Sequence, residues 1–165
     1  MQDIVAVPPD RREVEDLIYL EASLLDRWQF DAWLELYESD SLYRIPTWRS
    51  NGEATTDVAN ELSYVHFDHA SLSDYVMRMT SRHAHAFMPP PRATRMMTNL
   101  RITCDAEQAQ ANAAWLMHVT SVSGDEIFSG HVSYRLRRRS GGLGITAKEV
   151  VINNDRFPTG RFVLL

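Results

Sequence analysis

Residues 17–46 read LIYLEASLLDRWQFDAWLELYESDSLYRIP, and this stretch decides the fold. Apolar residues recur at helical spacing as far as Trp28, and a shorter apolar stripe predicts a second helix over 31–38. A strand over 41–45 follows and is stopped by Pro46. Helices in this order are expected to cover the mouth of a curved sheet. That architecture suits either a pocket enzyme or a subunit that supports another protein's active site.

The rest of the chain completes an α+β order. Asp10 and Glu13 have capping-box spacing at the start of a first helix over about 11–27, preceded by a loose segment over 1–9. A third helix is expected to follow residues 66–69 with a second capping-box-like start at Ser71 and Asp74. Turn signals and alternation predict a polar loop at 47–61 and strands at 62–67, 93–104, 110–122, 127–139 and 143–153. We therefore expect one α+β domain spanning 1–165, with a strongly curved, mostly antiparallel sheet packed on about three helices.

The composition is that of an ordinary globular chain. It has 165 residues, a formal net charge of −5 and one cysteine, Cys104, which we expect to be a small buried hydrophobe late in a strand. No apolar run approaches the roughly 20 residues of a membrane span, and the N-terminus does not look like a secretory signal. A cytoplasmic location is the expectation.

Two strands differ in their alternation. Residues 127–139 place Phe128, Val132, Tyr134 and Leu136 mainly on one face and polar side chains on the other. Residues 110–122 are fairly apolar on both faces. This strand is therefore expected to be covered on both sides, and the second cover could be another subunit.

Metal chemistry has few candidate ligands. A Rieske cluster needs two cysteines and two histidines, so this chain cannot hold one. His66, Asp68 and His69 could form a two-histidine, one-carboxylate iron site, but Asp68 is better explained as a cap near the third helix. His83 and His85 lie near the C-terminal end of the expected third helix, where the helix dipole favours cations and polar groups. We expect no metal site in this chain.

Glu21 falls within the apolar stripe of the first helix. A carboxylate there either reaches the rim or pairs with a cation inside, and Arg44, Arg92 and Arg95 are the candidate partners. Glu21 is either a structural ion pair or a pocket acid or base with a shifted pKa.

Asp26, Tyr43, His118 and His131 are the other groups that could transfer protons in a pocket. Nothing in their spacing is specific, and each histidine alone is more often structural.

Arginines give the second half a basic bias, at Arg92, Arg95, Arg101 and in the run RLRRR at 135–139. They either protect solvated strands or form a surface for an acidic partner chain. The negative net charge of the chain argues against nucleic-acid binding.

The ordered segments resemble the small (beta) subunit of aromatic-ring-hydroxylating dioxygenases. The opening 17–46 does so, as do HFDHASLSDYVMRM at 66–79, PPPRATRMMTNLRIT at 89–103 and FSGHVSYRLRRRSGGLGITAKEVVINN at 128–154. The departures are the ending FPTGRFVLL at 157–165 and Met96-Met97, which stands where relatives often carry a histidine or another polar residue.

The resemblance implies an NTF2-like (cystatin-like) cone without a cofactor. Three small subunits would assemble with three large subunits, and the large subunit would carry the Rieske cluster and the mononuclear iron. The alternative is a stand-alone NTF2-like dehydratase, isomerase or cyclase of a small aromatic or polyketide-like compound, using Glu21, Asp26, Tyr43 and His118. Convergence of these side chains on a cavity would support the enzyme, and a cone filled by Trp and Met side chains would count against it.

Overall fold

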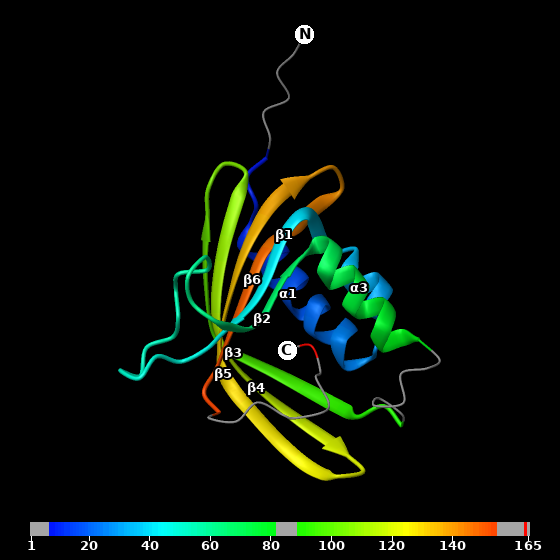
Figure 1. The fold of residues 1–165 in the computed structure, drawn as a ribbon. Coiled ribbons are helices and arrows are strands. Elements are labelled where there is room, and N and C mark those ends of the chain that lie inside the picture. The colour runs from blue at the N-terminus through cyan, green and yellow to red at the C-terminus, as the bar shows by residue number, and fades with distance from the viewer. Residues whose placement is uncertain (1–6, 82–88, 155–163, 165) are drawn as a thin grey trace.

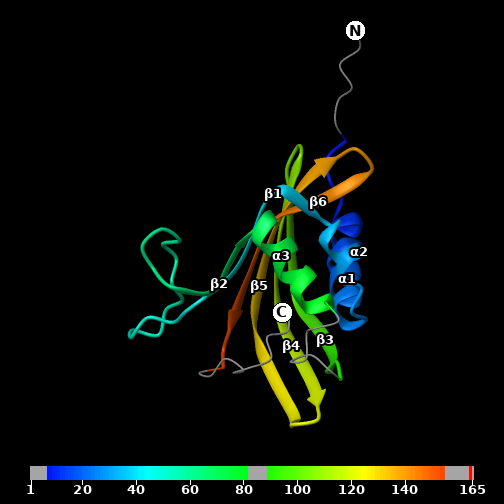
Figure 2. The same cartoon turned by 45° about the vertical axis from the view of Figure 1, so that its right-hand side comes forward.

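The computed structural model describes residues 7–81, 89–154 and 164. In chain order the elements are α1 Arg11–Asp26, α2 Phe30–Leu34, β1 Tyr37–Pro46, β2 Ser63–Asp68, α3 His69–Thr80, β3 Arg92–Cys104, β4 Gln108–Ser121, β5 Gly124–Arg139 and β6 Gly142–Ile152. The helices lie together on one side of a curved sheet, and the loop after β1 projects from the other side (Figures 1 and 2). The predicted α+β class with a mostly antiparallel sheet is confirmed.

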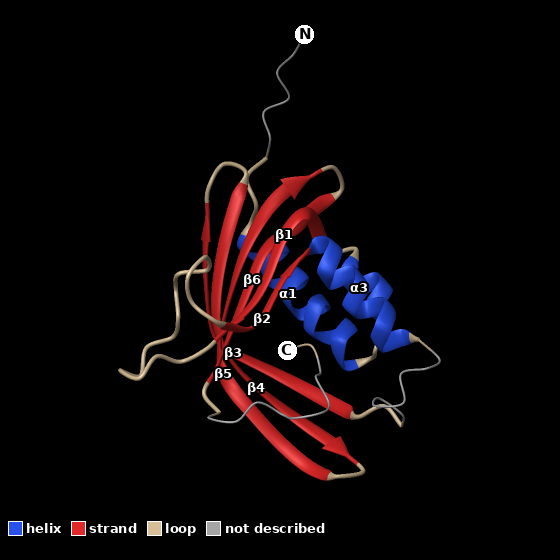
Figure 3. Cartoon of the chain, in the orientation of Figure 1, coloured by secondary structure: helices blue, strands red, loops and turns tan. Residues whose placement is uncertain are grey.

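The sheet has the order β2-β1-β6-β5-β4-β3. Only the β1–β6 pair is parallel, and β3 to β6 form a long antiparallel meander (Figure 3). The predicted strands of this meander are confirmed within a few residues. Positive φ angles, which glycine accommodates best, occur at Gly124 in the β4–β5 hairpin and at Gly141 and Gly142 in the β5–β6 hairpin.

The first helix begins as its sequence predicts. The side chain of Asp10 accepts a hydrogen bond of 2.8 Å from the backbone N–H of Glu13. The turn that follows α1 contains Trp28 at φ +59°, an uncommon conformation for a large side chain. Its indole donates to the carbonyl oxygen of Pro91 at 3.1 Å and packs edge-on against Phe30. These contacts tie the turn after α1 to the segment before β3 and to the first residue of α2.

The predicted end of the second helix was wrong. The apolar stripe continues to Tyr37, but α2 ends at Leu34 and Tyr37 already pairs with Ile145 of β6. The backbone N–H of Ile145 also donates to Leu36 at 2.8 Å. Pairing with β6 therefore makes Tyr37 part of a strand, although its spacing along the sequence favours a helix.

The capping-box-like start predicted at Ser71 and Asp74 was also wrong, whereas the predicted capping of the third helix by Asp68 is confirmed. Asp68, and not Ser71, is the N-cap, and its side chain accepts from the backbone N–H of Ser71 at 2.8 Å. Cys104 was predicted to be buried but is exposed at the end of β3. Its position beside the β3–β4 turn explains the difference. No helix among the described segments has the length and apolar character to cross a membrane.

The core fills the space between the helices and the inner face of the sheet. Its largest fully buried side chains are aromatic, with Trp33 from α2, Tyr43 from β1 and Tyr134 from β5. β4 contributes Trp115 and Met117 from its inward face. The interior of the cone is therefore packed with aromatic and methionine side chains.

Candidate functional site

A buried polar group lies at the centre of the cone, which we call the cone cluster: Glu21, Trp33, Tyr37, Tyr134 and Lys148. One oxygen of Glu21, Oε1, accepts from Lys148 Nζ and from the indole of Trp33, both at 2.7 Å, and from the Tyr37 hydroxyl at 3.1 Å. The other oxygen accepts from the Tyr134 hydroxyl at 3.2 Å. Glu21 is 0% exposed. Four donors, one of which, Lys148, is also the countercharge, therefore replace the water that this carboxylate loses.

Lys148 is the partner that the sequence analysis missed. The three predicted arginines are elsewhere: Arg44 bonds Glu149, Arg95 bonds Asp26, and Arg92 is exposed. That prediction was wrong because it ignored strand parity. In the strand predicted over 143–153, Lys148 shares a face with Val150 and Ile152. The apolar character of that face predicts that the Lys148 side chain points into the core.

Burial controls the protonation of the cluster. Desolvation raises the pKa of the Tyr37 and Tyr134 hydroxyls well above 10, and the nearby Glu21 carboxylate raises them further. Desolvation also lowers the pKa of Lys148, while its contact with Glu21 acts in the opposite direction. Both tyrosines therefore stay protonated near neutral pH and act as hydrogen-bond donors.

Asp26 is used for structure at the end of α1. It accepts from the backbone N–H of Arg95 at 3.0 Å and forms an ion pair with its guanidinium. The same guanidinium donates to the carbonyl oxygen of Leu164, which is fully buried. Asp26 thereby links α1 to β3, and Arg95 links β3 to Leu164.

The described residues of the cone line one small cavity. A cavity of about 10 Å³ lies among residues that include Arg95, Met97, Trp115, Tyr134 and Lys148. A cavity of that size holds about one water molecule. Arg95 Nε and the indole Nε1 of Trp115 are buried and have no hydrogen-bond partner among the described residues.

The five side chains predicted as proton-transfer candidates do not converge. Tyr43 lies in the cone, where its ring packs edge-on against Trp33 and is 5.7 Å from Lys148 Nζ. His118 lies on the outer face of β4, 45% exposed and 3.8 Å from Asp125. His131 is exposed on the outer face of β5. Glu21 and Tyr43 thus lie within the cone, Asp26 is fixed by Arg95, and both histidines lie on the far side of the sheet.

Asp68 and His66, two of the residues predicted as possible metal ligands, have places in the secondary structure that explain them without a metal. Asp68 caps α3, and its hydrogen bonds with Ser71 lower the pKa of its carboxyl. His66 lies in β2, opposite Arg44 of β1. Within the ranges that the structure describes, no group of three or more His, Cys, Asp or Glu side chains could hold a metal ion. His83 and His85 lie outside these ranges.

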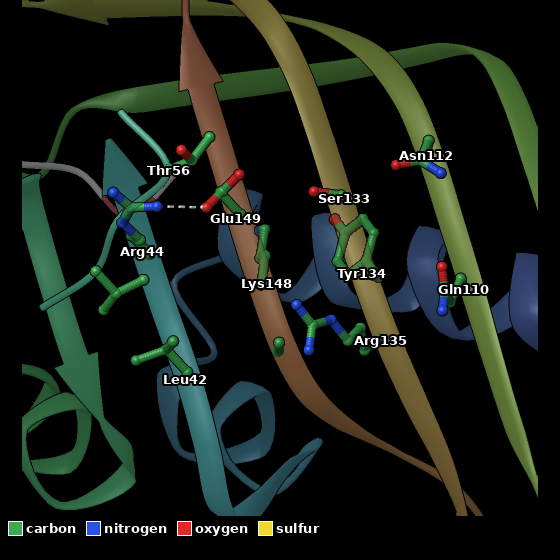
Figure 4. A pocket seen from close by; sticks show the side chains of 12 residues that line it. Leu42, Arg44, Thr56, Gln110, Asn112, Ser133, Tyr134, Arg135, Lys148 and Glu149 are labelled. Atoms are coloured by element: carbon green, nitrogen blue, oxygen red, sulfur yellow. Dashed lines mark hydrogen bonds and ion pairs between the residues drawn. The ribbon is translucent and has the colours of Figure 1, made fainter. Parts of the chain in front are cut away.

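The opposite face of the sheet carries a second feature, which we call the outer groove. It consists of two hollows of about 200 and 410 Å³ that share Asn112 and Ser133. Arg44 and Arg135 line the first hollow, and Arg101 and His131 line the second. Figure 4 shows the first hollow, with the Arg44–Glu149 ion pair between β1 and β6 and with Gln110 and Asn112 on β4.

The fold and sequence together match a known family. The family model described as "Ring hydroxylating beta subunit" matches residues 20–159. This chain belongs to that family. It is 33% identical over 157 residues to the small oxygenase component of the p-cumate 2,3-dioxygenase system of Pseudomonas putida, covering 94% of this chain and 86% of that relative. The chain is thus a beta subunit of the aromatic ring-hydroxylating dioxygenases, which are oxidoreductase complexes.

Solved structures agree on the fold of this beta subunit. The beta subunit of benzoate 1,2-dioxygenase from Burkholderia mallei matches with a TM-score of 0.74 at 22% identity, covering 94% of this chain and 95% of that chain. An NTF2-like protein with a cystatin-like fold from Novosphingobium aromaticivorans matches with a TM-score of 0.61 at 15% identity, covering 89% and 84%. The predicted NTF2-like fold is confirmed.

Proposed function

We propose that this beta subunit has no catalytic centre of its own and acts as a structural support for an iron-containing large subunit. In this proposal residues 1–165 form one domain, three copies assemble with three large subunits in the cytoplasm, and the complex hydroxylates an aromatic ring. The large subunit would hold the Rieske 2Fe–2S cluster and the mononuclear iron.

The observation that carries the proposal is the filled cone. Glu21 and Lys148 are held by internal partners, and the cavity of about 10 Å³ that the described residues line in the cone is far too small for an aromatic substrate. The sequence also has only one cysteine, and two are needed for Rieske ligation.

A stand-alone pocket enzyme is the second candidate, and one observation favours it. The cone cluster brings a carboxylate, an amine and two phenols within hydrogen-bonding distance, which is a set of groups able to move protons. However, a general acid or base must reach its substrate. Glu21 and Lys148 are each at most 2% exposed, so a substrate could not reach them without rearrangement of the core.

The test is reconstitution with the cognate large subunit. The chain alone, the large subunit alone and the two together are assayed for oxygen-dependent turnover of p-cumate with the matching electron-transfer proteins. We expect a stable complex, and turnover in no sample that lacks the large subunit. Turnover of a substrate by the chain alone, without complex formation, would overturn the proposal.

A further inference from the structure

Two buried donors in the cone lack an acceptor within the described part of the chain. They are Arg95 Nε on β3 and the indole Nε1 of Trp115 on β4. The side chain of Arg95 is 3% exposed and Trp115 is 6% exposed, so bulk solvent does not reach them. In the unfolded chain both N–H groups bond to water, and a buried N–H group that loses this bond without a replacement is destabilising. Each group therefore requires an acceptor inside the fold.

Both donors border the same cavity. Arg95 and Trp115 line the cavity of about 10 Å³ in the cone. In the antiparallel pair of β3 and β4, Met97 lies opposite Trp115 and Arg95 lies opposite Met117, so all four share one face of the sheet. Arg95 and Trp115 are diagonal neighbours on that face, a separation that long side chains can bridge. An acceptor in the cavity therefore lies beside both side chains.

The other walls of the cavity offer one side-chain oxygen. Two valines and a methionine supply mainly apolar surface, and the amine of Lys148 acts only as a donor when it is charged. The remaining side chain is Tyr134, whose hydroxyl donates to Glu21 at 3.2 Å and still has lone pairs that can accept. The walls thus present two unsatisfied donors and one acceptor to a molecule between them.

Size and charge identify that molecule as water. A cavity of about 10 Å³ fits one water molecule and is too small for an organic ligand. Charge argues against an anion such as chloride, because Lys148 is already paired with Glu21 and Arg95 with Asp26. An added anion would be a buried charge without a countercharge. Water is neutral and has two lone pairs for the two donors and hydrogens for the acceptor.

We propose that the cone binds one ordered water molecule, which accepts from Arg95 Nε and from the Trp115 indole and donates to the hydroxyl oxygen of Tyr134. About three hydrogen bonds are usual for a buried water. The water joins the two buried ion pairs of the cone into one network, because Tyr134 bonds Glu21 and Arg95 bonds Asp26. Both carboxylates belong to α1, so the network ties this helix to β3, β4 and β5. The site goes beyond the proposed function and does not depend on it.

A high-resolution crystal structure of the full chain tests the site directly. Crystals are grown in chloride and, separately, in bromide, whose anomalous scattering marks a halide ion. We expect one peak within about 2.7–3.2 Å of both nitrogen atoms, without an anomalous signal in bromide. An anomalous peak would identify a halide instead of water. That result, or a cavity without density, would overturn the proposal.

The indole N–H signals supply an independent readout in solution. The chain has four tryptophans, and the signal that disappears in Trp115→Phe identifies Trp115. We expect the Trp115 indole proton to show a cross-peak to water with the sign of a long-lived bound molecule. The matched control is Trp33, which is 0% exposed and donates to Glu21 at 2.7 Å, and which should show no such cross-peak. Absence of the Trp115 cross-peak would contradict the proposal, and equal cross-peaks at both indoles would mean general entry of solvent instead of one site.

The two measurements do not share a weakness. Circular dichroism checks that Trp115→Phe keeps the fold, and the crystal structure needs no variant, so a misfolded variant leaves the site testable. Neither measurement uses the large subunit. A failed reconstitution therefore contradicts the proposed function alone, and a missing water contradicts the site alone.

Discussion

Glu21 and Lys148 form an ion pair in which both side chains are at most 2% exposed. Isolated buried charges are unfavourable, so each member depends on the other and on the tyrosine and tryptophan donors around Glu21. The pair connects α1 to β6, elements far apart in the sequence. It therefore orients the helical layer on the sheet.

Lys148→Met is expected to lower the free energy of unfolding by about 3–5 kcal/mol, because it leaves Glu21 charged and without a countercharge. Urea denaturation followed by circular dichroism measures the loss. The double variant Glu21→Gln with Lys148→Met is expected to recover part of it, since no uncompensated charge remains. A single variant within about 1 kcal/mol of the original chain would contradict this role.

At the scale of elements, the ends of helices and the loop after β1 depend on single carboxylates. Asp68 accepts from the N–H of Ser71 at the start of α3. Glu61 accepts from Arg49 Nε at 2.5 Å and from the backbone N–H groups of Thr56 and Asp57 at 2.8 and 2.7 Å. These bonds order short segments that have little apolar burial of their own.

Asp68→Ala is expected to lower the free energy of unfolding by about 1 kcal/mol, because the first turn of α3 loses its cap. Asp68→Asn should cost much less, since an asparagine side chain caps equally well. Thermal unfolding of the two variants distinguishes them. Equal losses would show that the charge, and not the cap, is what matters.

The loop at 47–61 should loosen in acid. Hydrogen bonding to Arg49 is the main cause that lowers the pKa of Glu61 from 4.5 to about 2. The unfolded chain therefore takes up this proton at a higher pH than the folded chain, so the stabilisation is complete above about pH 4.5 and is lost as the pH falls through about 2.

The amide chemical shifts of Thr56 and Asp57 report this protonation. In the original chain they should titrate with a midpoint near 2. In Glu61→Gln the same step should be absent, and both amides should exchange faster at every pH. A midpoint near 4.5 in the original chain would mean that the Arg49 contact does not persist in solution.

At the scale of the whole molecule, the chain has one filled face and one open face. The inner face of the sheet packs against the helices around Trp33, Tyr134 and Met117. The outer face of β4 exposes Gln110, Asn112 and His118, with Ala114 and Leu116 only partly buried. Within the part of the chain that the structure describes, the helices thus cover one side of this strand, and the second cover by another subunit stays a prediction.

A filled cone predicts that small arenes do not bind inside the isolated chain. The thermal midpoint is expected to stay unchanged at millimolar p-cumate, because ligand binding to the folded state would raise it by mass action. A raised midpoint together with shifted signals of Trp115 and Tyr134 would show instead that the cone opens to ligands.

Local patterns were enough to predict most of the elements. The meander from β3 to β6 follows from alternation and from glycine turns, and the start of α1 follows from Asp10, because strands and caps are set by neighbouring residues. The resemblance carried by the ordered segments was enough to predict the family. The end of α2 was missed because Tyr37 has the spacing of a helix and the partner of a strand.

The amino-acid sequence by itself determined the α+β order, the mostly antiparallel sheet and the place of Glu21 on the apolar stripe of the first helix, since these depend on periodicity and on contacts along the chain. Only the tertiary structure decided that Lys148 and not an arginine neutralises Glu21, and that three arginines of the run at 135–139 bind acids of their own chain. Strand register and sheet order bring these groups together across roughly a hundred residues or more of sequence, and no local spacing encodes which charges then meet.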